Sequence, residues 1–150
     1  MTILKRTNAA DEDFKTLVTY LDAALRELDG EDHAFYSQFN NLNDIQTVVV
    51  CYVDDVPIAC GAFKKYSSHQ VEIKRMFVLP QHRGQGIGHL VLKELEVWAA
   101  SLQYSSCILE TGKKQPQAVS LYKKASYHII ENFGAYKEDE NSVCMAKNIS

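Results

Sequence analysis

Hydrophobic residues recur every three or four positions in two long stretches of the chain, which is the pattern of amphipathic helices. The first stretch begins at the acidic run Asp11–Asp13, which suits a helix N-terminus, and Gly30 ends it. The apolar positions are Phe14, Leu17, Val18, Leu21, Leu25 and Leu28 in the first stretch, and Ile87, Val91, Leu95, Trp98 and Leu102 in the second. Shorter helices are expected over residues 33–39 and 118–125.

Runs rich in β-branched and aromatic residues, which favour strands, lie between these helices. Turn residues at Asp54–Asp55 and Ser67–His69 separate three such runs, so the three predict an antiparallel meander. The expected strands cover residues 2–7, 47–53, 57–66, 71–79, 107–109, 127–130 and 142–146. The resulting order, β-α-α-β-β-β-α-β-α-β-β, predicts an α/β fold whose mixed sheet is antiparallel early and parallel around the long helix.

The length and charge of the chain narrow the class of protein. Its 150 residues fit one domain, which we place at residues 1–150. The net charge of −3 gives no support for binding to nucleic acid or to an anionic membrane. The N-terminus lacks the apolar stretch of a signal peptide, and no run is long enough to cross a membrane. We therefore expect a soluble, cytoplasmic protein without nucleic-acid or membrane partners.

The cysteines and histidines show no spacing typical of metal ligands. None of the four cysteines belongs to a Cys-x-x-Cys pair, and three lie in apolar, strand-like runs. We expect reduced, packed thiols, with a catalytic cysteine as the alternative. The five histidines are scattered along the chain, so no metal site is predicted.

Three glycines at positions 84, 86 and 88 lie between an expected strand and the long helix. Glycine lets a ligand approach the backbone closely, and a helix N-terminus presents unpaired N–H groups with a partial positive charge. Arg83 adds a permanent cation at the edge of this loop. The segment therefore predicts a site for a phosphate or pyrophosphate group.

The spacing of the glycines argues against the two most familiar nucleotide loops. A Walker loop places Lys and then Ser or Thr after its last glycine, whereas His89 and Leu90 follow Gly88 here. The dinucleotide fingerprint has glycine spacings of two and then three, whereas here both are two. The fingerprint also needs a parallel βαβ unit near the beginning of the fold, whereas the expected strand before this loop closes a meander.

The loop matches the pattern Arg-x-x-Gly-x-Gly, and with its neighbours it resembles the GNAT superfamily of acetyltransferases. Residues 71–80 resemble the fourth strand of that family, and Ala118 with Leu121–Tyr122 resembles its Ala-x-x-Leu-Tyr helix. Two positions depart from the family pattern. Gln115 stands where members commonly have Asn, and Ser126 stands where they commonly have Gly, which puts the end of that helix in question.

The resemblance implies transfer of acetyl from acetyl-CoA to a primary amine of a small molecule or amino acid, by direct attack in a ternary complex. A non-catalytic acyl-CoA sensor and a peptide or protein N-acetyltransferase are the alternatives. A homodimer formed through edge strands is also compatible with such a fold. The residues expected to contact the cofactor are Phe77, Val78, Arg83, Gly84, Gln85, Gly86, Ile87, Gly88, Gln115, Ala118 and Tyr122.

The implied reaction needs a base, an oxyanion donor and an acid. By resemblance Glu72 is the first candidate base, with Glu110 or ordered water as alternatives; Glu72 could instead pair with Lys74 or Arg75. A backbone N–H near Phe77 or Val78 is the expected oxyanion donor. Tyr122 is the candidate acid or hydrogen-bond donor to the CoA sulfur, and a packed core tyrosine is the alternative.

The acceptor end is less defined. Lys74 and Arg75 are candidates to hold a substrate carboxylate, and strand alternation predicts opposite faces for them, with Lys74 beside Glu72 and Met76. Tyr36, in the aromatic segment 33–40, and residues 133–136 are candidate walls of the acceptor cleft. Glu110 is a further candidate contact of the substrate. The sequence does not identify the amine.

Overall fold

A computed structural model describes residues 1–29 and 45–150 of the chain. The elements are β1 (Thr2–Thr7), α1 (Glu12–Asp29), β2 (Thr47–Val53), β3 (Val56–Lys65), β4 (Gln70–Val78), the 3₁₀ turn η2 (Pro80–His82), α3 (Ile87–Ser101), β5 (Ser106–Gly112), α4 (Pro116–Lys124), β6 (His128–Ile130), the 3₁₀ turn η3 (Gly134–Tyr136) and β7 (Ser142–Asn148). Each expected element in the described part is present. The helix predicted at 33–39, with Tyr36, lies outside the described residues.

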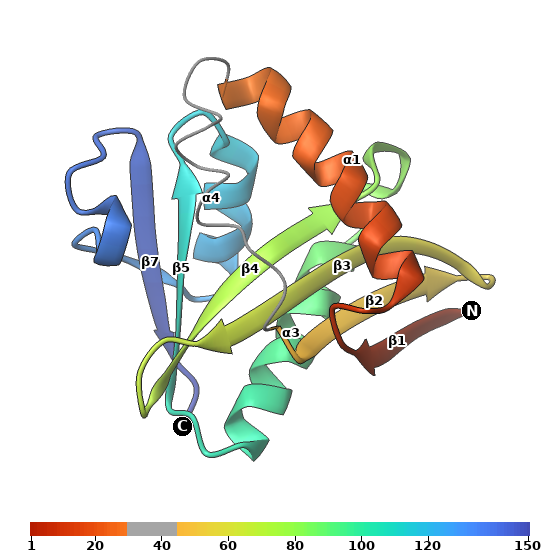
Figure 1. Cartoon of the computed structure of the whole chain (residues 1–150), viewed down its shortest axis with the longest axis horizontal. Coiled ribbons are helices and arrows are strands. Elements are labelled where there is room, and N and C mark those ends of the chain that lie inside the picture. The colour runs from red at the N-terminus through yellow and green to blue at the C-terminus, as the bar shows by residue number, and fades with distance from the viewer. Residues whose placement is uncertain (30–44) are drawn as a thin grey trace.

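The seven strands form one sheet in the order β1-β2-β3-β4-β5-β7-β6 (Figure 1). Neighbouring strands are antiparallel except β4 and β5, which are parallel and are connected through α3. The predicted mixed sheet, antiparallel early and parallel around the long helix, is therefore confirmed. The last strand, β7, inserts between β5 and β6, so the chain order is not the spatial order.

Helices cover both faces of the sheet, which gives two hydrophobic clusters. On one face, α1 places Phe14 and Leu17 against Val48 and Val50 of β2. On the other, α3 and α4 pack over a cluster that includes Val49 of β2. Because side chains alternate along a strand, the uninterrupted apolar run of β2 serves both clusters at once. Figure 1 shows α1 crossing the sheet on the side opposite α3.

The helix α1 begins where the acidic run predicted. Asp11 Oδ1 accepts the backbone N–H of Phe14 at 3.0 Å, which is the contact of an N-cap residue. The predicted apolar stripes are buried over most of their length, but their last members, Leu28 and Leu102, are exposed. All four cysteines are free and buried, as expected.

The strands β4 and β5 pair at their beginnings and then diverge. The parallel register joins Gln70–Glu72 of β4 to Ser106–Ile108 of β5. Beyond Glu72 the two strands separate, and Figure 1 shows the opening between their carboxyl ends. Ligands of open α/β sheets commonly bind outside the carboxyl ends of parallel strands, so this opening is the natural place for a site.

A β-bulge in β4 corrects the predicted placement of its side chains. Cys60 pairs with Phe77 and Ala62 with Lys74, so Arg75 and Met76 together oppose Gly61. Arg75 has a φ of 59°, the left-handed backbone of the extra residue. Lys74 and Arg75 therefore both face α1, whereas Met76 packs in the cluster under α3. The alternation that placed Lys74 beside Met76 and opposite Arg75 is wrong because the bulge interrupts the two-residue period.

None of the helices in the described ranges is long and apolar enough to cross a membrane.

Candidate active site

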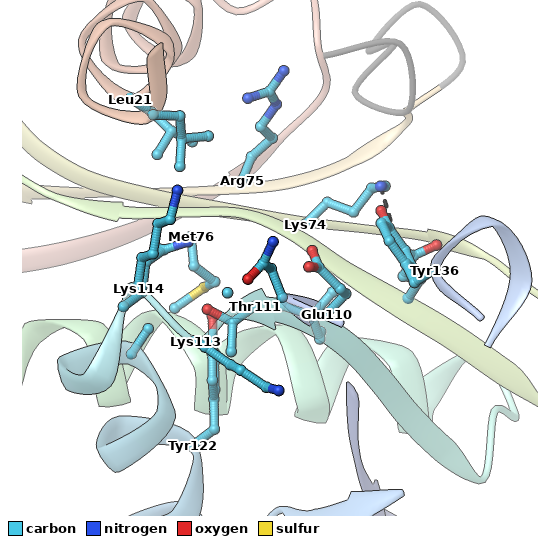
Figure 2. Close-up of a pocket in the computed structure, with 17 residues that line it drawn as sticks. Leu21, Lys74, Arg75, Met76, Glu110, Thr111, Lys113, Lys114, Tyr122 and Tyr136 are labelled. Atoms are coloured by element: carbon cyan, nitrogen blue, oxygen red, sulfur yellow. Dashed lines mark ion pairs between the residues drawn. The ribbon is translucent and has the colours of Figure 1, made fainter. Parts of the chain in front are cut away.

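A cleft of about 140 Å³ occupies the opening between β4 and β5 (Figure 2). Its floor is formed by the two strands, one wall by α1, and the other by α4 with the segment leading into it. The lining residues are Leu21, Leu25, Glu72, Ile73, Lys74, Arg75, Met76, Glu110, Thr111, Gly112, Lys113, Lys114, Gln115, Ala118, Tyr122, Tyr136 and Asn141. The opening in the sheet thus brings together titratable side chains from β4, β5 and α4.

Glu72 and Lys74 form a buried ion pair on β4. Lys74 Nζ lies 3.2 Å from Glu72 Oε2, and the two residues are 5% and 8% exposed. They share a face because they are two residues apart on the strand, before the bulge. Burial lowers the pKa of Lys74, and the neighbouring Glu72 carboxylate opposes that shift. Each of the two charges is therefore stabilised by the other. An ion pair of Glu72 with Lys74 was one of the alternatives that the sequence left open.

Glu110 projects into the cleft from β5. Its Oε2 atom accepts a hydrogen bond from Ser142 Oγ of β7 at 2.8 Å. Burial, the largest cause, raises the pKa of Glu110 to about 7; the charge of Asp139 adds to the shift, and the Ser142 hydrogen bond opposes it. A carboxyl that titrates near neutrality can both accept and release a proton at physiological pH.

Tyr122 points from α4 into the cleft (Figure 2) and is 7% exposed. Burial, followed by the nearby charge of Glu110, raises the pKa of its hydroxyl. The ring stands edge-on to Tyr127, with ring centroids 5.8 Å apart. The hydroxyl therefore stays protonated at neutral pH and can donate a hydrogen bond to a group in the cleft.

Arg75 is held on the α1 side of the cleft by its bulge. Its Nη1 atom lies 2.6 Å from Asp22 Oδ1 of α1, and the side chain is 6% exposed. The carbonyl of the same residue accepts a contact of 3.4 Å from Cys60 Sγ. The ion pair fixes α1 against β4 at the point where the helix forms the cleft wall.

The glycine loop leads into α3 beside this cleft. Gly84 and Gly86 have φ values of 78° and 80°, and a Cβ atom at either would meet nothing within 4 Å. Gly86 is the N-cap of α3, and the first turn of that helix has no acidic residue. The loop thus combines a left-handed backbone, open space and a helix N-terminus, the features of an anion site.

The glycine loop and the start of α3 contact β4 and α4, which border the cleft. Arg83 Nε donates to the carbonyl of Val78 at 2.9 Å, and the guanidinium lies 5.7 Å from the ring centre of Phe77. A Cβ atom on Gly88 would lie 3.3 Å from Leu121 of α4 and 3.6 Å from Val78 of β4. Glycine at this position therefore lets α3 and α4 approach each other closely beside the end of β4.

The structure brings together most of the predicted site residues. Seven of them line the cleft: Glu72, Lys74, Arg75, Glu110, Gln115, Ala118 and Tyr122. Phe77, Val78 and residues 83–88 adjoin it at the end of β4 and the start of α3 without lining it. Tyr136, from the expected second wall, also lines it, whereas Tyr36 lies outside the described residues.

Sequence reasoning missed several residues of the site. Leu21 and Leu25 belong to the apolar stripe of α1 and cannot be told from core residues by periodicity. Lys113 and Lys114 could have been predicted from the sequence, because they follow a strand expected to be parallel. Ligands commonly bind at the carboxyl ends of such strands. Ser142 and Asp139 carried none, since only the insertion of β7 next to β5 brings them to Glu110.

Comparisons with known proteins agree with this geometry. The model of the acetyltransferase (GNAT) family matches residues 12–127. The chain is 32% identical over 139 residues to the IAA acetyltransferase of Azospirillum brasilense, covering 87% of each chain. It superposes with a TM-score of 0.84 and 26% identity on a Klebsiella pneumoniae protein assigned to the acyl-CoA N-acyltransferases, covering 100% of this chain and 99% of that one.

A paia N-acetyltransferase from Thermoplasma acidophilum, solved in complex with coenzyme A, shares the fold with a TM-score of 0.71 at 18% identity; the match covers 99% of both chains. The family model extends over more than half of the chain and covers α1, β4, β5 and α4, which form the floor and walls of the cleft. The chain therefore belongs to the GNAT family of acetyltransferases and is an acetyl-CoA-dependent acyltransferase.

Proposed function

We propose that this protein transfers acetyl from acetyl-CoA to the primary amine of a small molecule, by direct attack within a ternary complex. The observation that carries the proposal is that Glu110 and Tyr122 line the same cleft, beside the glycine loop. A carboxyl that titrates near neutrality suits removal of a proton from the amine, and a phenol that keeps its proton suits a hydrogen bond to the departing thiolate.

The glycine loop and its neighbours would hold the cofactor. The backbone N–H groups at the start of α3 suit the pyrophosphate of CoA, and the open space at Gly84 and Gly86 lets it approach. Arg83 supplies a cation at the same place. The remaining contacts we assign to the cofactor are Phe77, Val78, Gln85, Ile87, Gly88, Gln115, Ala118 and Tyr122.

We assign the role of base to Glu110 in preference to Glu72. An alkyl ammonium has a pKa of about 10.4 and must lose a proton before it attacks the thioester. Glu110 titrates near 7 and lines the cleft, whereas Glu72 is engaged by Lys74 at 3.2 Å. Glu72 is then a positioning residue that keeps Lys74 charged at the cleft floor.

Attack by the amine produces an oxyanion and then a thiolate. A backbone N–H near Phe77 or Val78, at the end of β4 that diverges from β5, is the donor we assign to the oxyanion. Tyr122 donates to the departing sulfur. Because the pKa of this phenol is raised, its main contribution is a hydrogen bond that stabilises the developing thiolate.

The acceptor end of the cleft combines an apolar wall with cations. Leu21 and Leu25 of α1 form the wall. Lys74 and Arg75 are each paired with an acidic residue, whereas Lys113 and Lys114 lie exposed at the rim. Lys114 reaches toward Leu21 (Figure 2). This arrangement favours a small amine that also has an apolar part and a carboxylate, such as an amino acid.

The proposal is tested by incubating the protein with acetyl-CoA and a panel of amino acids, aminoglycosides and peptides, and by measuring the release of free thiol. We expect release with at least one small amine, and less after Tyr122→Phe although CoA still binds. Tyr20→Phe is the control, because Tyr20 is 51% exposed on α1. CoA binding without thiol release from any amine would favour the sensor function. Release with peptides alone would favour the peptide acetyltransferase.

A further inference from the structure

Ser142 joins two carboxyl groups. Its Oγ atom lies 2.8 Å from Glu110 Oε2 and 2.8 Å from Asp139 Oδ2. A hydroxyl has a single hydrogen, so it can donate to only one of these oxygens at a time. The second contact is a hydrogen bond only when the other carboxyl is protonated and donates to the serine oxygen. The three groups therefore form a continuous hydrogen-bonded path when they hold one extra proton.

The path leads out of the cleft. Of the described residues, Glu110 lines the cleft, but neither Ser142 nor Asp139 does. Ser142 is 5% exposed, whereas Asp139 is partly exposed to solvent. The path thus starts at a buried carboxyl in the cleft, passes through a buried hydroxyl, and ends at a carboxyl that water reaches.

The path has a rigid frame. The Asn132 side-chain amide donates to the carbonyls of Tyr136 at 3.1 Å and Asp139 at 3.0 Å. The backbone N–H of Asn141 donates to Asp139 Oδ1 at 2.9 Å, which orients Oδ2 toward Ser142. Pairing of β5 with β7 fixes the serine relative to Glu110. The loop between η3 and β7 therefore positions Asp139 beside Ser142, and the pairing of β5 with β7 positions Glu110.

We propose that Ser142 and Asp139 act as a proton relay that returns Glu110 to its basic form after each turnover. The inference rests on the proposed function, in which Glu110 takes a proton from the amine while substrate and cofactor fill the cleft. Glu110 then gives that proton to Ser142 Oγ as the serine gives its own to Asp139 Oδ2. Serine ends neutral, Glu110 ends ionised, and Asp139 releases the proton to water.

The charges around Glu110 are compatible with such a transfer. Asp139 and Glu72 are negative and favour the protonated form, whereas Lys74 is positive and favours the ionised form. Tyr122 also faces it from α4, with a hydroxyl that stays protonated. Burial raises the pKa of Glu110 to about 7 and the surrounding charges shift it in both directions, so both of its forms are populated near neutral pH.

Kinetics of Ser142→Ala and Asp139→Asn test the relay, with acetyl-CoA and one fixed primary amine from the panel. Each variant keeps Glu110 but removes a member of the path. We expect kcat to fall by roughly tenfold to a hundredfold, which is at or below the low end of what positioned proton transfer contributes, because Glu110 itself is kept. The KM for acetyl-CoA should not change, and added imidazole should restore part of kcat. Ser142→Thr keeps the hydroxyl and should restore most of it.

Glu138→Gln is the matched control, since it neutralises an exposed carboxylate next to Asp139 in the same loop. Glu110→Gln separates failure of the relay from failure of the proposed base. Loss of activity in Glu110→Gln, with full kcat in both relay variants at every pH, would show that the relay alone is wrong. Full activity in Glu110→Gln would overturn the base and the relay together.

A measurement without substrate guards against misfolded variants. Carboxyl ¹³C NMR of the free protein follows the titration of Glu110 directly. Asp139→Asn removes a negative neighbour and should lower the pKa of Glu110, whereas Ser142→Ala removes a donor and should raise it. An identical titration of Glu110 in the wild type and both variants would overturn the relay.

Discussion

The hydroxyl of Tyr127 donates a hydrogen bond of 2.9 Å to Glu96 Oε2, joining the segment between α4 and β6 to the middle of α3. Lys147 of β7 donates to the other oxygen of the same carboxylate at 2.8 Å. Glu96 is 4% exposed, so its charge depends on these two partners. Since the ring of Tyr127 packs edge-on against Tyr122, this buried carboxylate also fixes the neighbour of the proposed acid.

Tyr127→Phe should lower the free energy of unfolding by about 1–3 kcal/mol, because the buried Glu96 loses one of its donors while the packing of the ring is kept. Urea unfolding measures this change, with Tyr20→Phe as a control at an exposed tyrosine. Equal losses in the two variants would show that the hydrogen bond to Glu96 does not stabilise the fold.

Ser126→Gly should stabilise the protein by about 1 kcal/mol. Ser126 has a φ of 77°, and the backbone N–H of Tyr127 reaches back to the carbonyl of Tyr122 at 2.9 Å, as in a Schellman motif. A left-handed backbone costs a non-glycine residue about 1–2 kcal/mol, part of which glycine regains. Ser126→Ala keeps the strain and is the control. Thermal unfolding should separate the two variants; matching melting temperatures would contradict this account.

Gly86→Ala should weaken CoA binding by more than it weakens the fold. Strain at a φ of 80° costs about 1–2 kcal/mol, but nothing lies within 4 Å of the new Cβ, so the fold should tolerate it. The methyl group would occupy the space proposed for the pyrophosphate. Gly134→Ala is the matched control, with a φ of 55° and its nearest contact, the Tyr66 hydroxyl, at 3.7 Å, and Gly134 does not line the cleft. Calorimetry with CoA should show a loss for Gly86→Ala alone.

Stability should depend on pH through Glu110. Its pKa rises from the ordinary 4.5 to about 7 in the fold, so between these values the folded state binds more protons than the unfolded state. This contribution is complete below pH 4.5 and is lost as pH rises through 7. It amounts to at most about 3 kcal/mol. The free energy of unfolding of Glu110→Gln relative to wild type should therefore increase from pH 5 to pH 8, and a constant difference would contradict it.

Local patterns were enough for the elements and the glycine loop. Helical and two-residue periods placed α1, α3 and the meander, because burial of one face dictates where apolar residues stand. Gly84 and Gly86 could be identified from the sequence because few residue types fit a left-handed loop at a helix start. The alternation of β4 failed at Arg75, since a bulge changes the face of every residue after it and leaves no mark in the sequence.

By itself, the sequence determined the mixed sheet, the glycine loop and the presence of Glu72, Glu110 and Tyr122 on elements near that loop, since these depend on residues close together in the chain. Only the tertiary structure decided their relationships. It paired Glu72 with Lys74, left Glu110 to titrate near neutrality, and placed Ser142 and Asp139 beside it. The reason is physical: burial and the distances between charges depend on which distant strands become neighbours, here β5 and β7.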